Sequence, residues 1–133
     1  MKKIADSGFL IAALDKSDHY HSWARTILEK EEPPWLVCEP VVAEVCASIG
    51  TAEPMLEMLH LGDLELEFSL ARDTTEVLAL VRKYRDQKMD LADACVVRMS
   101  ELFQGSMVYT VDRKDFSVYR RHGRHRIPCV FPD

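Results

Sequence analysis

Acidic side chains occur in this sequence just after short segments that favour β-strands. Asp6 directly follows the run Lys2 to Ala5, and Asp112 comes three residues after the segment Met107 to Tyr109. The carboxyl ends of the strands in a parallel sheet lie at one edge, where the clefts of such proteins form. We therefore expect both carboxylates at strand ends on one side of a sheet, close enough to share an ion.

Three further acids stand at or near predicted helix starts. Asp90 and Asp93 occupy the first turn of a predicted helix, and Glu44 lies one turn into another. Singly, each has a structural explanation: Asp90 as an N-cap, Asp93 as an acid favoured by the helix dipole, and Glu44 as an exposed helix residue. Together, four or five carboxylates at one edge would repel one another unless a cation neutralised them. A ligand set made only of oxygen suits Mg²⁺ or Mn²⁺ and not zinc.

The elements that would position these acids alternate between strands and helices along the whole chain. Strands are predicted at Lys2–Ala5, Trp35–Cys38, Leu64–Phe68, Met107–Tyr109 and Cys129–Phe131. Helices are predicted at Phe9–Leu14, from a cap at Asp18 to Pro33, from Pro40 to Gly50, at Glu53–Leu61, from a cap at Asp73 or Thr74 to about Tyr84, at Leu91–Phe103 and at Lys114–Tyr119. This alternation predicts one α/β domain over residues 1–133, with a central, mainly parallel sheet of four or five strands and helices on both faces.

Composition narrows the class of protein. A hydrophobic share of 47% with 29% charged residues is typical of a globular chain, and no apolar stretch approaches the roughly 20 residues that span a bilayer. The four cysteines show no C-x-x-C spacing, which favours free thiols in a reducing cytoplasm over a zinc or redox site. We therefore expect a cytoplasmic protein with no membrane association.

Basic residues form two local clusters in a chain whose net charge is −5. That net charge argues against bulk electrostatic binding of nucleic acid but leaves local basic patches open. The clusters are Arg82, Lys83, Arg85 and Lys88, and later Arg120, Arg121, Arg124 and Arg126.

The sequence lacks the residues that several classes of enzyme require. The chain has no phosphate-binding loop of the G-x-x-x-x-G-K-[ST] type, no G-x-G-x-x-G turn and no G-x-S-x-G elbow. A phosphoaspartate enzyme of the haloacid dehalogenase type needs a second aspartate two residues after Asp6, where Gly8 stands. A receiver-type phosphoacceptor domain needs an acidic pair beside the first strand, where Ala5 and Ser7 stand.

Four short motifs carry a resemblance to a known family that covers nearly the whole chain. They are Ile4 to Leu10, Val41 to Val45, Leu91 to Ala94, and Tyr109 to Asp112 with Asp115-Phe116 just after. In order and separation they resemble the PIN domains, in particular the VapC-type ribonuclease toxins of prokaryotic toxin–antitoxin pairs. A catalytically silent PIN-like module that binds RNA or protein remains the alternative.

The resemblance implies a hydrolase that cleaves RNA phosphodiester bonds with a divalent ion, Mg²⁺ or Mn²⁺. Asp6, Glu44, Asp93 and Asp112 would be the acidic quartet; Asp90 is either a fifth acid or only a cap. Metal would be held by Asp6, Asp93 and Asp112, with Ser7 and Thr110 orienting the acids. The residues expected to hold flanking RNA phosphates are Arg82, Lys83, Arg85, Arg113, Arg120 and Arg121.

The same resemblance implies a small antitoxin partner and a homodimer. We expect the antitoxin to lay an apolar helix over exposed side chains near Phe9, Leu10 and Trp23. A basic side chain of the partner would then reach Asp6 and Asp93, because a guanidinium can take the place of a cation among carboxylates.

Overall fold

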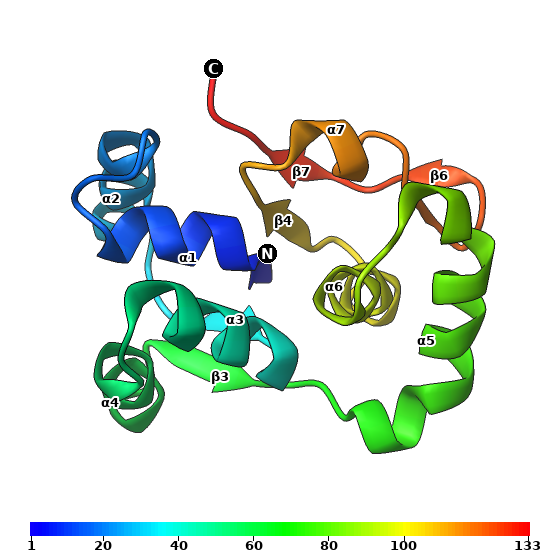
Figure 1. The fold of residues 1–133 in the computed structure, drawn as a ribbon, viewed down its shortest axis with the longest axis horizontal. Coiled ribbons are helices and arrows are strands. Elements are labelled where there is room, and N and C mark those ends of the chain that lie inside the picture. The colour runs from blue at the N-terminus through cyan, green and yellow to red at the C-terminus, as the bar shows by residue number, and fades with distance from the viewer.

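A five-stranded parallel sheet lies at the centre of the computed structural model, which describes residues 1–133 (Figure 1). Its strands are β1 (Lys3–Ala5), β2 (Trp35–Val37), β3 (Leu64–Leu66), β4 (Met107–Tyr109) and β7 (Cys129–Val130). They lie in the order β3-β2-β1-β4-β7, and every neighbouring pair is parallel. The strand order reverses between β1 and β4, and the carboxyl ends at such a reversal are where ligands bind in open α/β sheets. The predicted parallel sheet is confirmed.

Helices connect the strands, and a small hairpin follows the fourth strand. The helices are α1 (Ser7–Leu14), α2 (His21–Lys30), α3 (Glu39–Ile49), α4 (Glu53–Leu61), α5 (Leu70–Lys83), the 3₁₀ helix η1 (Arg85–Gln87), α6 (Leu91–Leu102) and α7 (Arg113–Phe116). The strands β5 (Arg120–Arg121) and β6 (His125–Arg126) pair antiparallel. In Figure 1, α1 to α4 lie to the left of the view and α5 to the right, with α6 between them. None of the helices combines the length and the hydropathy that a membrane-spanning segment needs.

Helix α5 begins earlier than expected. Its N-cap is Ser69, whose hydroxyl accepts a hydrogen bond from the Arg72 N–H at 3.2 Å, so the predicted caps at Asp73 or Thr74 are wrong. Asp73 instead lies at a kink inside the helix, with φ −106° and ψ 22°. Serine caps helices as well as aspartate does, which makes two closely spaced candidates hard to rank from sequence.

Helix α2 begins later than the predicted cap at Asp18. The Asp18 carboxylate accepts a hydrogen bond from the Tyr20 N–H at 2.8 Å and forms a turn before the helix starts at His21. The β5–β6 hairpin was not predicted, because its two-residue strands are charged and show no hydrophobic alternation.

The first helix is largely buried in the core, which contradicts the expected exposed apolar patch on it. Phe9 and Leu10 are fully buried, and Trp23 is half-buried with its ring edge-on to that of Phe9 at a centroid distance of 5.7 Å. The predicted exposed apolar patch at these residues is therefore wrong. Helix α1 is apolar on nearly every side and packs against both α2 and α3, which buries Phe9 and Leu10. All four cysteines are free, as predicted.

Candidate metal centre and active site

Asp6 stands directly after β1 and is held against β4. Its backbone N–H donates to the carbonyl oxygen of Tyr109 at 3.0 Å, and the residue is only 4% exposed. The Thr110 hydroxyl donates to Asp6 Oδ2 at 2.7 Å, whereas Oδ1 is buried with no hydrogen-bond partner. Burial raises the pKa of Asp6 to about 6, and the charges of Asp112 and Glu44 also raise it. An unpartnered buried carboxylate oxygen is costly, so a cation at this oxygen would relieve the cost.

Asp93 enters the site from the first turn of α6. The helix is capped as predicted, since Asp90 Oδ1 accepts a hydrogen bond from the Asp93 N–H at 2.8 Å. The Tyr119 hydroxyl donates to Asp93 Oδ2 at 2.9 Å. Burial raises the pKa of Asp93 to about 8, with the neighbouring charges of Asp6 and Asp90 acting in the same direction.

Asp112 repeats at α7 the arrangement that Asp90 has at α6. Asp112 Oδ1 accepts a hydrogen bond from the Asp115 N–H at 3.0 Å, and the Asp112 N–H donates to the Thr110 hydroxyl at 3.0 Å. Carboxylate oxygens of Asp93, Asp112 and Asp115 all lie within 4.8 Å of one another. Burial and then the neighbouring Asp112 raise the pKa of Asp115.

Asp115 was given no role from the sequence, although a signal for it exists. The motif Asp-x-x-Asp occurs three times, at Asp15–Asp18, Asp90–Asp93 and Asp112–Asp115. The first copy follows the end of α1, whereas in the other two the first aspartate caps a helix and the second brings its carboxylate into the site. Recognising that the last two copies share a position at a helix start would have placed Asp115 beside Asp93.

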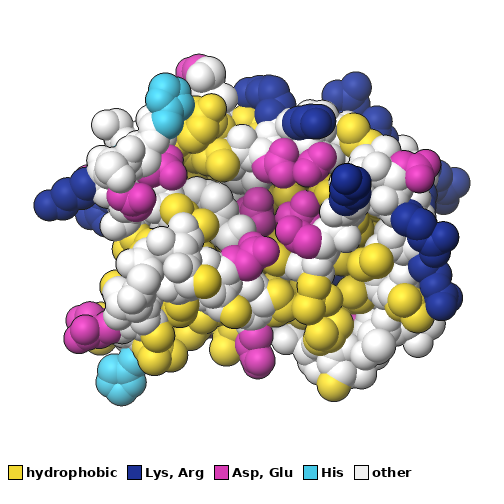
Figure 2. Space-filling view, viewed as in Figure 1, with side chains coloured by type: hydrophobic (Ala, Val, Ile, Leu, Met, Phe, Trp, Pro, Cys, Tyr) yellow, Lys and Arg dark blue, Asp and Glu magenta, His cyan; other side chains and the backbone are white.

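The remaining predicted site residues lie around this centre. Glu44 is exposed on α3 and acts on Asp6 through its charge, but it is not among the three clustered acids. Ser7 begins α1 directly after Asp6. Figure 2 shows acidic side chains near the middle of this face, with Lys and Arg side chains along its upper and right-hand edges.

The donor set fits a hard divalent cation. Carboxylates supply every side-chain ligand of the clustered group, no thiol or imidazole belongs to it, and one oxygen of Asp6 lacks a partner. Mg²⁺ and Mn²⁺ prefer such oxygen ligands. The raised pKa values of Asp6 and Asp93 have the same origin, because buried carboxylates close to one another resist ionisation until a positive charge arrives.

A close backbone approach brings Asp6 beside Asp112. Gly8, in the first turn of α1, faces the loop between β4 and α7, and a Cβ at this position would lie 2.6 Å from Val111 Cγ2. Any side chain at position 8 would therefore push against the residue between Thr110 and Asp112. The missing side chain lets α1 begin next to the end of β4.

The six residues predicted to contact RNA differ in whether the chain already engages their side chains. Three arginines are engaged within the chain: Arg113 with the Pro132 carbonyl, Arg120 with three carbonyls at the end of α7, and Arg121 with Phe103 and Ser106. Lys83 donates to the Gly123 carbonyl at 3.3 Å. Arg82 and Arg85 are exposed and take part in none of the ion pairs.

Comparison with known proteins gives the family. The model of the PIN domain matches residues 3–121, which is most of the chain. This chain belongs to the PIN domain family. It is also similar to Ribonuclease VapC26 of Mycobacterium tuberculosis, with 26% identity over 133 residues that cover 96% of this chain and 98% of that protein. The resemblance inferred from the four sequence motifs is thereby confirmed, and all five acids of the site lie inside the segment that the PIN model matches.

Proposed function

We propose that this protein is a divalent-metal-dependent endoribonuclease and the toxin of a type II toxin–antitoxin pair. The observation that carries the proposal is the cluster of Asp93, Asp112 and Asp115 at the strand-order reversal of a PIN fold, together with the buried, unpartnered Oδ1 of Asp6. Asp6 lies outside that cluster but is near enough for its charge to raise the pKa of Asp93. Membership of the PIN family and the similarity to a protein named as a VapC ribonuclease support the same activity.

The chain's own residues would hold and orient the ion. Asp6, Asp93 and Asp112 are the proposed ligands, Asp115 is a fourth acid within reach, and Glu44 stands at the rim. Mg²⁺ or Mn²⁺ bound there would polarise the scissile phosphate and make an attacking water more acidic.

Hydrogen bonds fix these ligands in place. The Thr110 hydroxyl accepts a hydrogen bond from the Asp112 N–H and donates one to Asp6, so a single side chain sets the positions of two acids. Tyr119 orients Asp93 in the same way from beyond the end of α7. Asp90 holds the first turn of α6 and acts here as a cap.

Cleavage of RNA by the purified protein tests the proposal. We expect cleavage with Mg²⁺ or Mn²⁺, none with EDTA, and a loss of about a hundredfold or more in Asp6→Asn, because the variant keeps the size of the side chain but not its charge. Glu65→Gln, at an exposed position on the edge strand β3, removes a carboxylate elsewhere and should cleave at the wild-type rate. If the wild-type protein binds RNA but never cleaves it, the chain is a silent PIN-like module and the proposal is wrong.

The proposed partners and location follow from the same activity. RNA would be the substrate, and a small antitoxin would close the site. The protein would encounter both in the cytoplasm. The homodimer implied by the family resemblance stays a prediction, to be checked by sedimentation of the free chain.

A further inference from the structure

A basic cavity lies beside the acidic site. It is a shallow hollow open to solvent, with a volume of about 430 Å³, and its lining comprises Val81, Arg82, Arg85, Lys88, Met89 and Asp90. The three cations are exposed, and none belongs to any of the four ion pairs of the structure. Three positive charges therefore face one negative charge, and the cations have no partner in the chain.

The end of α5 explains why these cations gather around one hollow. Leu80, Tyr84 and Met89 turn into the core, which leaves Arg82, Arg85 and Lys88 at the surface. The chain then makes the short turn η1 and reaches Lys88, whose φ of 55° is left-handed. Lysine seldom adopts this conformation, because its Cβ crowds the backbone.

The cavity and the acidic site share a wall. Asp90 lines the cavity and also caps α6, where its Oδ1 accepts a hydrogen bond from the Asp93 N–H. Asp90 and Asp93 are thus about one helical turn apart, or about 5 Å along the helix axis. A ligand in the cavity lies immediately next to the acids that would hold the metal.

We propose that this cavity binds a backbone phosphate of single-stranded RNA next to the phosphate that is cleaved. Guanidinium and ammonium groups are the side chains that bind phosphate oxygens best. Contacts to phosphate oxygens carry no sequence information, so a phosphate held by these three cations would be bound independently of sequence. The inference rests on the proposed function and adds to it a place for the strand on one side of the site.

Binding measurements test the cavity separately from cleavage. The probe is a short fluorescein-labelled single-stranded RNA in Ca²⁺, followed by anisotropy over a series of salt concentrations and checked on a gel for intact RNA. In Arg82→Gln/Arg85→Gln/Lys88→Gln we expect the affinity to fall about tenfold or more, as expected when a charge-assisted hydrogen bond is removed. The slope of log affinity against log salt should fall by about 0.7 for each phosphate that the variant no longer neutralises.

A matched variant controls for the change in net charge. Lys2→Gln/Lys16→Gln/Lys30→Gln also removes three exposed cations, but Lys2 precedes β1, and Lys16 and Lys30 lie around α2, across the molecule from α5 (Figure 1). This variant should bind RNA with the wild-type affinity and salt slope. Equal losses of affinity in both triple variants would overturn the proposal, since the effect would then be one of total charge.

A further arm locates the phosphate along the RNA. Single uncharged methylphosphonate linkages are placed one at a time on either side of the cleavage position. We expect weaker binding of wild type for linkages on one side only, and no such weakening in the cavity variant. Weaker binding for linkages on both sides, or an effect that persists in the cavity variant, would show that the cavity does not hold the strand.

Lys88→Gly separates binding from folding. Glycine accepts the left-handed conformation, so the variant should unfold at the same temperature as wild type or higher while it binds RNA more weakly. Unchanged RNA binding with weaker binding of a co-expressed protein partner would assign the cavity to that partner. The two hypotheses fail differently: wild type that cleaves no RNA refutes the proposed function, whereas wild type that cleaves, together with a cavity variant that binds normally, refutes only this inference.

Discussion

Tyr119 links the last turn before the hairpin to the acidic site. Its ring is fully buried against Tyr84 and Phe116, with centroid distances of 5.0 and 5.2 Å, and its hydroxyl donates to Asp93 Oδ2. Burial, and next the charge of Asp93, raise the pKa of Tyr119, so the phenol keeps its proton and remains a donor. Its position makes it a residue that orients Asp93 without contacting a substrate.

Removing this hydroxyl should weaken ion binding more than folding. In Tyr119→Phe we expect Mn²⁺ affinity, measured by calorimetry, to fall several-fold, because one oxygen of Asp93 loses its orienting donor. The free energy of unfolding should fall by about 1 kcal/mol.

Tyr84→Phe is the matched control for that variant. Its hydroxyl accepts a hydrogen bond from the Arg120 N–H at 2.8 Å and belongs to the same aromatic group, but its hydrogen bond does not involve the acids. Similar destabilisation with normal Mn²⁺ affinity is expected. If the two variants bind Mn²⁺ equally well, Tyr119 has no positioning role.

Local signals explain which site residues could be predicted. Asp6 and Asp112 were placed by the strands that precede them, and Asp90 and Asp93 by the start of a helix, all within a few residues in sequence. The contact from Tyr119 to Asp93 spans 26 residues and depends on how α7 returns to α6, which no local pattern encodes.

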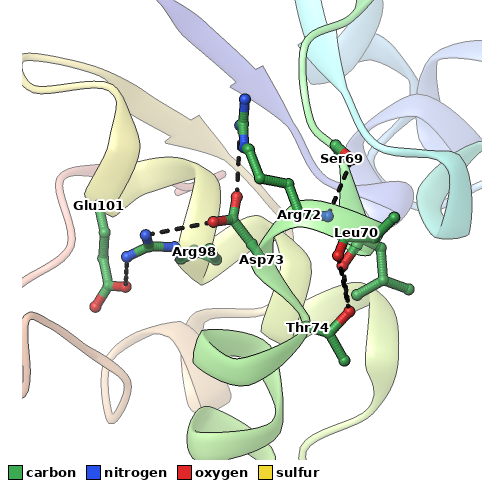
Figure 3. Close-up of polar contacts among 8 residues, drawn as sticks. Ser69, Leu70, Arg72, Asp73, Thr74, Arg98 and Glu101 are labelled. Atoms are coloured by element: carbon green, nitrogen blue, oxygen red, sulfur yellow. Dashed lines mark hydrogen bonds and ion pairs between the residues drawn. The ribbon is translucent and has the colours of Figure 1, made fainter.

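At the scale of elements, α5 and α6 are joined by a charged network across the kink in α5. Arg98 of α6 lies 3.6 Å from Asp73 and 3.2 Å from Glu101, and Asp73 also pairs with Arg72 at 3.5 Å (Figure 3). The second oxygen of Glu101 accepts a hydrogen bond from the His122 N–H in the hairpin at 2.8 Å. Both carboxylates facing Arg98 are about nine-tenths buried, and besides Arg98, Asp73 has only the exposed Arg72 and Glu101 only the His122 N–H.

Arg98→Met should therefore cost far more than the removal of a surface pair. Without the cation, two buried carboxylates keep only an exposed arginine and a backbone N–H as partners, and we expect the free energy of unfolding to fall by about 3 kcal/mol. Arg25→Met breaks an exposed pair with Glu29 one helical turn away and should cost about 0.5 kcal/mol or less. Urea unfolding of both variants provides the comparison, and similar costs would show that the buried network does not hold α5 to α6.

The same network shows why element boundaries were harder to predict than element types. Each strand of the central sheet and each helix from α1 to α7 has a counterpart among the predicted segments, and α4 and β4 match to the residue. The start of α5 was wrong because Asp73 looks like a cap in sequence but uses its carboxylate for Arg98, a residue 25 positions away in another helix.

At the scale of the molecule, the acidic site makes stability depend on pH and on the ion together. The pKa of Asp6 is raised to about 6 and that of Asp93 to about 8, both above the value of 3.8 for an exposed aspartate. Between the exposed and the raised values the folded protein holds protons that the unfolded chain releases. The free energy of unfolding of the ion-free protein therefore falls as the pH rises from about 4 towards 8, with each unit of pKa shift worth about 1.4 kcal/mol.

Thermal unfolding in EDTA should show this loss of stability as a falling Tm between about pH 5 and pH 8. Mg²⁺ or Mn²⁺ should restore the Tm at the upper end and change it little at the lower end, where protons already neutralise the acids. Asp6→Asn/Asp93→Asn should flatten the profile and unfold at a higher temperature than wild type at pH 8 without ion. A Tm of the ion-free wild type that rises over this range would contradict the account.

The contact between Gly8 and Val111 also limits how this protein could evolve. Position 8 is where phosphoaspartate enzymes of the haloacid dehalogenase type carry their second aspartate, and a single base change converts many glycine codons to aspartate codons. Here the first atom of such a side chain would lie 2.6 Å from Val111 Cγ2. Such an aspartate would force Val111 or the neighbouring backbone to move, and a smaller residue at position 111 would remove this obstacle. The order in which positions 8 and 111 mutate would therefore decide whether the change at position 8 is tolerated.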